Sequence, residues 1–161
     1  MFRIGSGHDT HRLVPDRPLI LGGVNVPYHL GLYGHSDADV VLHALTDALL
    51  GALALGDIGD AYPDTDPQWQ GANSQFFLRE TILQLKARDW HIVNVDITIF
   101  AEKPKLGPLK QAMRESVANL LGVPSDCVSI KAKTGEKVGH IGRGEAIGCH
   151  AIALLQKEDS P

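Results

Sequence analysis

Several features that define other classes of protein are scarce in this chain of 161 residues. Two cysteines without a Cys-x-x-Cys motif are too few for a disulfide framework. With 15 Lys and Arg against 19 Asp and Glu, the net charge of -4 provides no basic surface for nucleic acid or an anionic membrane. No apolar run is long enough to cross a bilayer, and the residues after Met1 do not resemble a signal peptide. We therefore predict a cytoplasmic protein with neither nucleic-acid nor membrane partners.

Histidine and glycine are well represented instead, with eight and 17 residues. The chain is 43% hydrophobic and 21% charged, which is typical of a globular domain and excludes a disordered or collagen-like chain. Its length fits one domain with a sizeable core. We predict a single domain over residues 1–161, with residues 156–161 as a frayed tail.

Periodicity predicts an α+β fold. Alternating apolar residues predict strands over 2–7, 91–100, 128–133 and 147–155, and a hairpin over 17–27 that bends at Gly22 and Gly23. Apolar residues at helical spacing predict helices over 38–55, from 73 or 74 to about 87, and from 108 to 122. Strands adjacent to strands at both ends predict a mixed sheet with the helices packed on one face.

Three local features sharpen this prediction. Ser36 resembles the N-cap of the first helix, with Asp39 completing a variant of the capping box. Residues 57–72 carry turn formers without periodicity, which predicts a long surface loop, a kind of segment that is often functional. In strand 91–100, the alternation places Val93, Val95, Ile97 and Ile99 on one side.

A candidate metal site begins with Asp9 and His11. In an extended segment, residues two apart point to the same face, so this carboxylate and imidazole can converge on one ion. His43 lies in the first helix, with Asp39 and Asp47 one turn away on the same side. It is either a partly exposed histidine beside carboxylates or a third ligand whose other nitrogen is oriented by Asp47. Three such ligands would leave tetrahedral zinc one open position.

Two further segments are candidate anion sites. At His35 and Ser36, backbone N–H groups and side chains at the helix entry could receive phosphate, although capping alone explains the serine. Residues 133–145 form a glycine-rich segment with Arg143, which could either hold phosphate or be a turn region. From the residues alone, three functions stay open: a metal-assisted phosphoryl-transfer enzyme, a zinc hydrolase acting on a phosphoester, and a noncatalytic nucleotide-binding module with a structural zinc.

A family resemblance covers nearly the whole chain. The motifs that carry it are Asp9-x-His11, Gly34-His35-Ser36-Asp37-x-Asp39, the segments 43–51, 56–59, 63–67, 94–96 and 101–105, Thr134-x-Glu136-Lys137, and Gly142-Arg143-Gly144-Glu145. In this order they resemble the 2-C-methyl-D-erythritol 2,4-cyclodiphosphate synthase family of non-mevalonate isoprenoid synthesis.

The resemblance implies a lyase-type cyclisation in the bacterial cytoplasm. The substrate would be 4-diphosphocytidyl-2-C-methyl-D-erythritol 2-phosphate, whose 2-phosphate attacks the β-phosphorus so that CMP leaves and a cyclic diphosphate forms. It also implies an α+β subunit that assembles as a homotrimer with shared active sites. Zn²⁺ would bind each subunit, and Mg²⁺ or Mn²⁺ would accompany the substrate diphosphate.

Site residues also follow from the resemblance. Asp9, His11 and His43 would hold zinc, Glu136 would hold the second ion, and His35 and Thr134 would stabilise the transition state. Other substrate contacts would come from Ser36, Asp57, Ile58, Gly59, Tyr62, Asp64, Asp66, Ala101, Lys105, Leu106, Gly107, Ala132, Lys133, His140 and Arg143. His140 and His150 depart from the Phe and Glu common at these positions in the family, which puts apolar ligand binding near the trimer axis in doubt.

Overall fold

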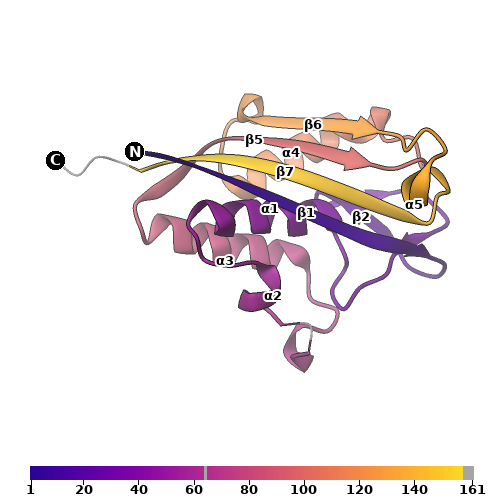
Figure 1. The fold of residues 1–161 in the computed structure, drawn as a ribbon, viewed down its shortest axis with the longest axis horizontal. Helices are drawn as coiled ribbons and strands as arrows, with labels where there is room; N and C mark the ends of the chain where they lie inside the picture. The colour runs from indigo at the N-terminus through magenta and orange to yellow at the C-terminus, as the bar shows by residue number, and fades with distance from the viewer. Residues whose placement is uncertain (64, 158–161) are drawn as a thin grey trace.

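The computed structural model describes residues 1–63 and 65–157 and is built on a mixed five-stranded sheet (Figure 1). The strand order is β4-β1-β7-β5-β6, and only β5 and β6 run parallel among these neighbours. The strands are β1 (Phe2–Val14), β4 (Gly31–Leu32), β5 (Trp90–Phe100), β6 (Val128–Lys133) and β7 (Ala146–Lys157). The α+β prediction is confirmed.

Helices and a small hairpin surround this sheet. The hairpin pairs β2 (Leu19–Leu21) with β3 (Val24–Val26) and turns at Gly22 and Gly23, as predicted. The three long helices are α1 (Val40–Ala52), α3 (Ser74–Lys86) and α4 (Lys110–Leu121). Short helical turns are α2 (Ile58–Ala61), α5 (Gly139–Gly142), η1 (Pro67–Trp69), η2 (Gly107–Leu109) and η3 (Ser125–Cys127).

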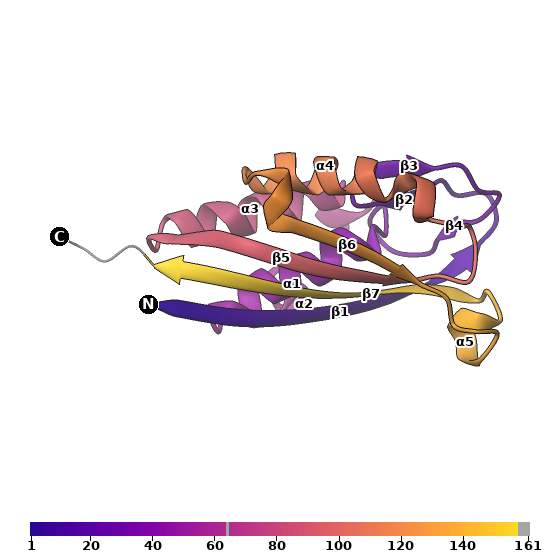
Figure 2. The same cartoon turned by 90° about the horizontal axis from the view of Figure 1, so that it is seen from above.

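The long helices cover one face of the sheet (Figure 2). Inward residues such as Ile97 and Ala151 are fully buried in the core between sheet and helices. Along β1 the alternate residues point the other way, so Phe2 and Ile4 are 61% and 69% exposed. A sheet with one face packed and the other uncovered produces this alternation.

Helix α1 lies unusually close to β1 because two glycines face it. A Cβ at Gly5 would meet the Ala48 carbonyl at 1.9 Å, and one at Gly7 would meet the Ala44 carbonyl at 2.0 Å. No side chain larger than hydrogen fits there. The next two inward residues of β1 are Asp9 and His11, so the same approach brings the strand's polar residues against α1.

The structure corrects several boundaries. The N-cap of α1 is Asp39, not Ser36, because the Asp39 carboxylate accepts the Val41 and Leu42 N–H groups at 3.1 and 3.2 Å. Val93 lies at a bulge where the register of β5 shifts, so Ile92 faces inward instead.

Two segments are more regular than predicted. The loop 57–72 contains α2 and η1, each capped by an aspartate. Residues 156 and 157 are not frayed, because β7 continues through them and the Lys157 N–H donates to the Met1 carbonyl at 2.9 Å. The rest of the predicted tail, 158–161, lies outside the described residues. Among the described helices, none has the length and apolarity required to span a membrane.

Candidate metal centre and active-site pocket

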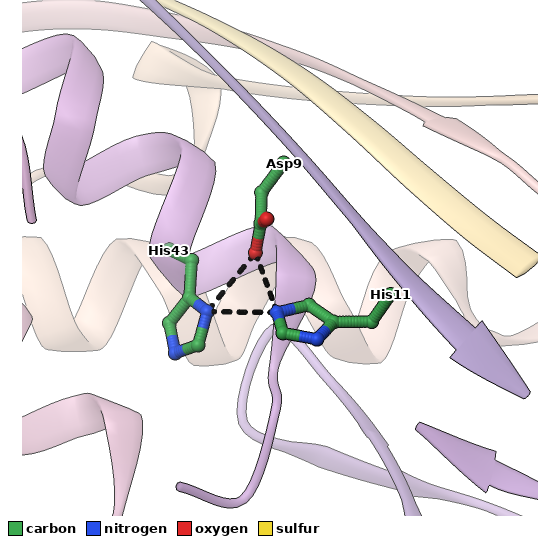
Figure 3. Close-up of side chains that lie close together, drawn as sticks. All are labelled: Asp9, His11 and His43. Carbon is green, nitrogen blue, oxygen red and sulfur yellow. Dashed lines mark hydrogen bonds and ion pairs between the residues drawn. The ribbon is translucent and has the colours of Figure 1, made fainter. Parts of the chain in front are cut away.

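Asp9, His11 and His43 converge as the sequence predicted (Figure 3). Asp9 Oδ2 lies 2.9 Å from His11 Nε2 and 3.0 Å from His43 Nδ1, and the two nitrogens are 3.3 Å apart. Zinc–nitrogen bonds of about 2.0–2.1 Å place tetrahedral ligand atoms about 3.3 Å apart. The three donor atoms therefore fit one face of a tetrahedral metal site.

Each histidine has a second contact that fixes its ring. His11 Nδ1 lies 2.6 Å from the Tyr33 carbonyl oxygen, so it donates there and leaves Nε2 for the site. His43 Nε2 lies 2.8 Å from Ser74 Oγ and 3.2 Å from Ser36 Oγ. The prediction that Asp47 orients His43 is wrong, since these two serines contact Nε2, and Asp47 Oδ1 accepts the Ile58 N–H at 2.8 Å instead.

The charges at this centre are strongly coupled. Burial acts to raise the pKa of Asp9, but its interactions with His11 and His43 outweigh burial and hold the pKa far below its usual range. Burial acts to lower the pKa of His11, and its contacts with Asp9 raise it overall. In the metal-free centre the anionic form of Asp9 and the protonated form of His11 therefore stabilise one another, and a metal ion would compete with that proton.

An open pocket of about 970 Å³ surrounds these three side chains. Its size lies within the range of small-molecule sites. Eight predicted residues line it: Asp9, His11, His35, Ser36, His43, Ile58, Gly59 and Tyr62. We call this region the metal pocket.

Other residues that line the metal pocket were not predicted from the sequence. Arg17 lines it and donates to the carbonyls of Gly34 and Ser36 at 2.9 and 2.7 Å, which braces the turn that carries His35. Trp69 and Phe77 add an aromatic wall beside Tyr62, whose ring centroid is 4.8 Å from that of Phe77. No local motif marks these residues, because their contacts join distant parts of the chain.

Two predicted residues support the metal pocket from its border. Asp57 caps α2 by accepting the Asp60 N–H at 2.9 Å, and Asp66 caps η1 by accepting the Gln68 N–H at 3.0 Å. Aspartate at such N-caps is a signal that the sequence offered and the loop interpretation overlooked. The predicted contact Asp64 lies outside the described residues.

A second group of predicted residues gathers at a different place, which we call the β5–β6 edge. Because β5 and β6 are parallel, their carboxyl ends lie together, and the Ala101 N–H donates to the Lys133 carbonyl at 2.9 Å. The Thr134 hydroxyl donates to Glu136 Oε1 at 2.8 Å. The predicted residues of this edge and of the loop and α5 that follow are Ala101, Lys105, Leu106, Gly107, Ala132, Lys133, Thr134, Glu136, His140 and Arg143. None of them is among the residues that line the metal pocket.

Comparisons with known proteins find the same family over nearly the whole chain. Residues 2–156 match the YgbB family. A 2-C-methyl-D-erythritol 2,4-cyclodiphosphate synthase of Dechloromonas aromatica is 55% identical over 156 residues, with 97% of this chain and 98% of the relative covered. The synthase of the same name from Burkholderia ambifaria is 57% identical over 157 residues and covers 98% of each chain.

Solved structures share the fold. The bifunctional IspDF of Campylobacter jejuni superposes with a TM-score of 0.95 at 40% identity, covering 99% of this chain, which spans 43% of that longer protein. A CDP complex of IspF from Plasmodium falciparum gives a TM-score of 0.87 at 34% identity, covering 98% and 97% of the two chains. With the sequence matches, these likenesses show that the chain belongs to the YgbB family of enzymes that form 2-C-methyl-D-erythritol 2,4-cyclodiphosphate.

Proposed function

We propose that the metal pocket is the centre at which this enzyme cyclises 4-diphosphocytidyl-2-C-methyl-D-erythritol 2-phosphate. The observation that carries the proposal is the convergence of Asp9, His11 and His43 on the wall of the pocket. Among the described residues, no other His, Cys, Asp or Glu joins this cluster. A fourth coordination position open to a ligand favours a catalytic over a structural metal.

The donor set suits zinc in particular. Two imidazole nitrogens and one carboxylate oxygen are ligands that Zn²⁺ accepts, and their separations match a tetrahedral ion. The exposed carboxylate of Glu136 at the β5–β6 edge suits a harder ion such as Mg²⁺ or Mn²⁺. Bound in these two places, the cations would offset the repulsion between the substrate's phosphates and polarise the attacked phosphorus.

The protein's own part is to orient two phosphoryl groups of one molecule in line. A phosphate at neutral pH is already an anion, so the attacking oxygen needs no general base, and binding supplies the orientation. His35 and Ser36 would donate to phosphate oxygens in the metal pocket, where the guanidinium of Arg17 holds their turn. Thr134 would donate to the diphosphate as charge builds up on its oxygens.

The remaining contacts divide between the two regions. The metal pocket would hold the methylerythritol and its phosphates, through Ser36, Asp57, Ile58, Gly59, Tyr62, Asp64 and Asp66. The β5–β6 edge, with the loop and α5 that follow, would hold the cytidine and diphosphate, through Ala101, Lys105, Leu106, Gly107, Ala132, Lys133, Thr134, Glu136, His140 and Arg143. Cytidine recognition is consistent with the CDP complex of the Plasmodium falciparum protein.

We also propose that a homotrimer completes the site. The metal pocket and the β5–β6 edge are separate within one subunit, and the sheet face away from the helices carries the exposed apolar Phe2 and Ile4. Burying these two side chains against a neighbouring subunit would remove apolar surface from water. If the β5–β6 edge of one subunit faced the metal pocket of a neighbouring subunit, the two groups of substrate-binding residues would form one active site. A location in the bacterial cytoplasm stays a prediction from the sequence.

Phosphorus NMR tests the reaction directly. Incubation of the zinc- and magnesium-loaded enzyme with the cytidine substrate should yield a cyclic diphosphate and CMP in equal amounts. A chiral β-phosphorus should be inverted, because one in-line displacement with no phosphoenzyme is proposed. A linear phosphate product would indicate hydrolysis instead, and retention of configuration would contradict the single displacement.

A further inference from the structure

We propose that Ser74 and Asp37 are positioning residues that hold His43 as the tautomer with its proton on Nε2. This inference rests on the proposed metal site, because its consequence is that the Nδ1 lone pair of His43 faces the other ligands. Ser74 is the first residue of α3, and Asp37 belongs to the turn before α1. Asp37 stands in one of the family motifs, but neither residue was among the site residues predicted from the sequence.

The contacts of the ring define which nitrogen faces the site. His43 Nδ1 lies 3.0 Å from Asp9 Oδ2 and 3.3 Å from His11 Nε2. His43 Nε2 lies on the opposite side of the ring, 2.8 Å from Ser74 Oγ. A neutral imidazole carries one proton, so a proton on Nδ1 would block metal binding at the atom that faces the centre.

Proton counting then assigns the tautomer. The hydroxyl of Ser74 has one proton and donates it to Asp37 Oδ1. Its oxygen can therefore only accept from His43, which requires a proton on Nε2. The arrangement extends the carboxylate–histidine–metal pattern by one hydroxyl group placed between carboxylate and ring.

Asp37 is the final acceptor in this series of hydrogen bonds, and other contacts fix its position. Besides the Ser74 hydroxyl, its carboxylate accepts the N–H groups of Ser74 at 3.1 Å and Asp39 at 3.2 Å. Ser74 is fully buried, so its hydroxyl has no access to bulk water as an alternative partner.

A weaker acceptor also stands near the ring. Ser36 Oγ lies 3.2 Å from His43 Nε2 and accepts the Ala38 N–H at 3.1 Å. Its distance from the ring is the longer of the two, and among the described residues no carboxylate accepts its proton. We therefore assign the main orienting role to Ser74 and Asp37.

A purely structural role for Ser74 would be to anchor the first turn of α3 on Asp37. Ser74→Ala separates the two roles when it is compared with Thr81→Ala. Thr81 is also fully buried on α3, but its hydroxyl donates to the Phe77 carbonyl at 2.9 Å and not to His43. Both variants lose one buried hydroxyl from the same helix, and only the first loses the contact to the metal ligand.

The readouts are zinc affinity, measured by competition with a chelator, and the His43 ring protons in long-range ¹H–¹⁵N spectra of the zinc-loaded protein. We expect Ser74→Ala to weaken zinc binding about 10–100-fold, the usual effect of losing such a partner. The wild type should show an Nε2-bound proton protected from exchange, and Ser74→Ala should lose this protection. Thr81→Ala should keep both properties while lowering stability.

Asp37→Asn provides a second variant if Ser74→Ala does not fold. Its amide oxygen can still accept the Ser74 hydroxyl, so we expect a smaller loss of zinc affinity in the same direction. Wild-type affinity in a folded Ser74→Ala or Asp37→Asn protein, or zinc bound through Nε2 of His43, would overturn the inference alone. Absence of zinc binding by the wild type would instead overturn the proposed metal site.

Discussion

The metal pocket and the β5–β6 edge differ in how the fold supports them. The metal pocket is built beside a close approach of two elements, where Gly5 and Gly7 let α1 rest on β1. Asp9, His11 and His43 are part-buried there, and each has a partner that fixes its orientation. At the β5–β6 edge, Thr134 and Glu136 are exposed and bond mainly to one another.

This difference indicates that the two regions have different functions, metal binding in one and substrate recognition in the other. A metal ion needs ligands placed to within tenths of an ångström, which a rigid strand and helix provide. Recognition of a flexible diphosphate tolerates a looser surface that is completed when substrate or a neighbouring subunit arrives. Variants in the metal pocket should therefore alter metal content, whereas variants at the edge should alter catalysis on an intact zinc protein.

The largest expected effect is that of His43→Ala. Removing one of three ligands should abolish tight zinc binding and reduce activity to background, while α1 stays folded because alanine favours helix. Metal analysis, circular dichroism and the phosphorus NMR assay measure the three properties. Full activity with unchanged zinc content would remove His43 from the ligand set.

Thr134→Ala should come next. Loss of a donor to the developing phosphate charge should cost about 2–4 kcal/mol of transition-state stabilisation, by analogy with an oxyanion-hole donor. The matched control is Thr134→Ser, which keeps the hydroxyl and should keep much of the activity. Steady-state kinetics at saturating zinc decides the point, and equal rates for the alanine and serine variants would contradict the role of the hydroxyl.

Glu136→Gln should have a smaller and more selective effect. The change keeps the shape of the side chain but removes one charge from the second ion, so we expect about tenfold weaker Mg²⁺ or Mn²⁺ dependence, about 1.4 kcal/mol. Zinc content and the unfolding midpoint should not change. A divalent-ion titration identical to that of the wild type would exclude Glu136 from the second site.

The smallest effect concerns pH and the metal-free protein. The lowered pKa of Asp9 contributes stability above its ordinary value of 3.8 that is lost as pH falls. The raised pKa of His11 contributes stability below its ordinary value of 6.5 that is lost as pH rises through the folded value. The stabilisation should therefore be largest between about pH 4 and 6.5.

Urea unfolding in the presence of a chelator tests this window, with Asp9→Asn as reference. The stability difference between wild type and Asp9→Asn should shrink from pH 6 to pH 8.5. Burial raises the pKa of Asp39 to about 6, which makes stability fall as pH rises through the acid range, but this contribution is present in both proteins and cancels. A difference that stays constant between the two pH values would contradict the coupling of Asp9 with His11.

Much of this protein was accessible from local sequence. The spacing of two in Asp9-x-His11 predicted that this pair shares one face of a strand, because strand periodicity fixes which face a side chain occupies. Helical spacing placed His43 at the edge of the buried face of the first helix, but only the family resemblance selected it as the third candidate ligand. The same periodicity predicted the α+β order and most element boundaries. Loop 57–72 was misread because its short helices depend on single aspartate caps rather than on apolar repeats.

Other features were decided only by the tertiary structure. Asp39 became the cap of α1 because the hairpin turn packs against it, where Gly22 and Gly23 donate to its carboxylate at 2.9 and 2.7 Å. Arg17 and Tyr33 reached the metal pocket, and Ser74 reached His43 from behind it, through contacts that span 17, 22 and 31 residues of sequence. Periodicity in the sequence indicates on which face of a helix or strand a residue lies. Which residue of another element it contacts depends on how the separate elements pack together.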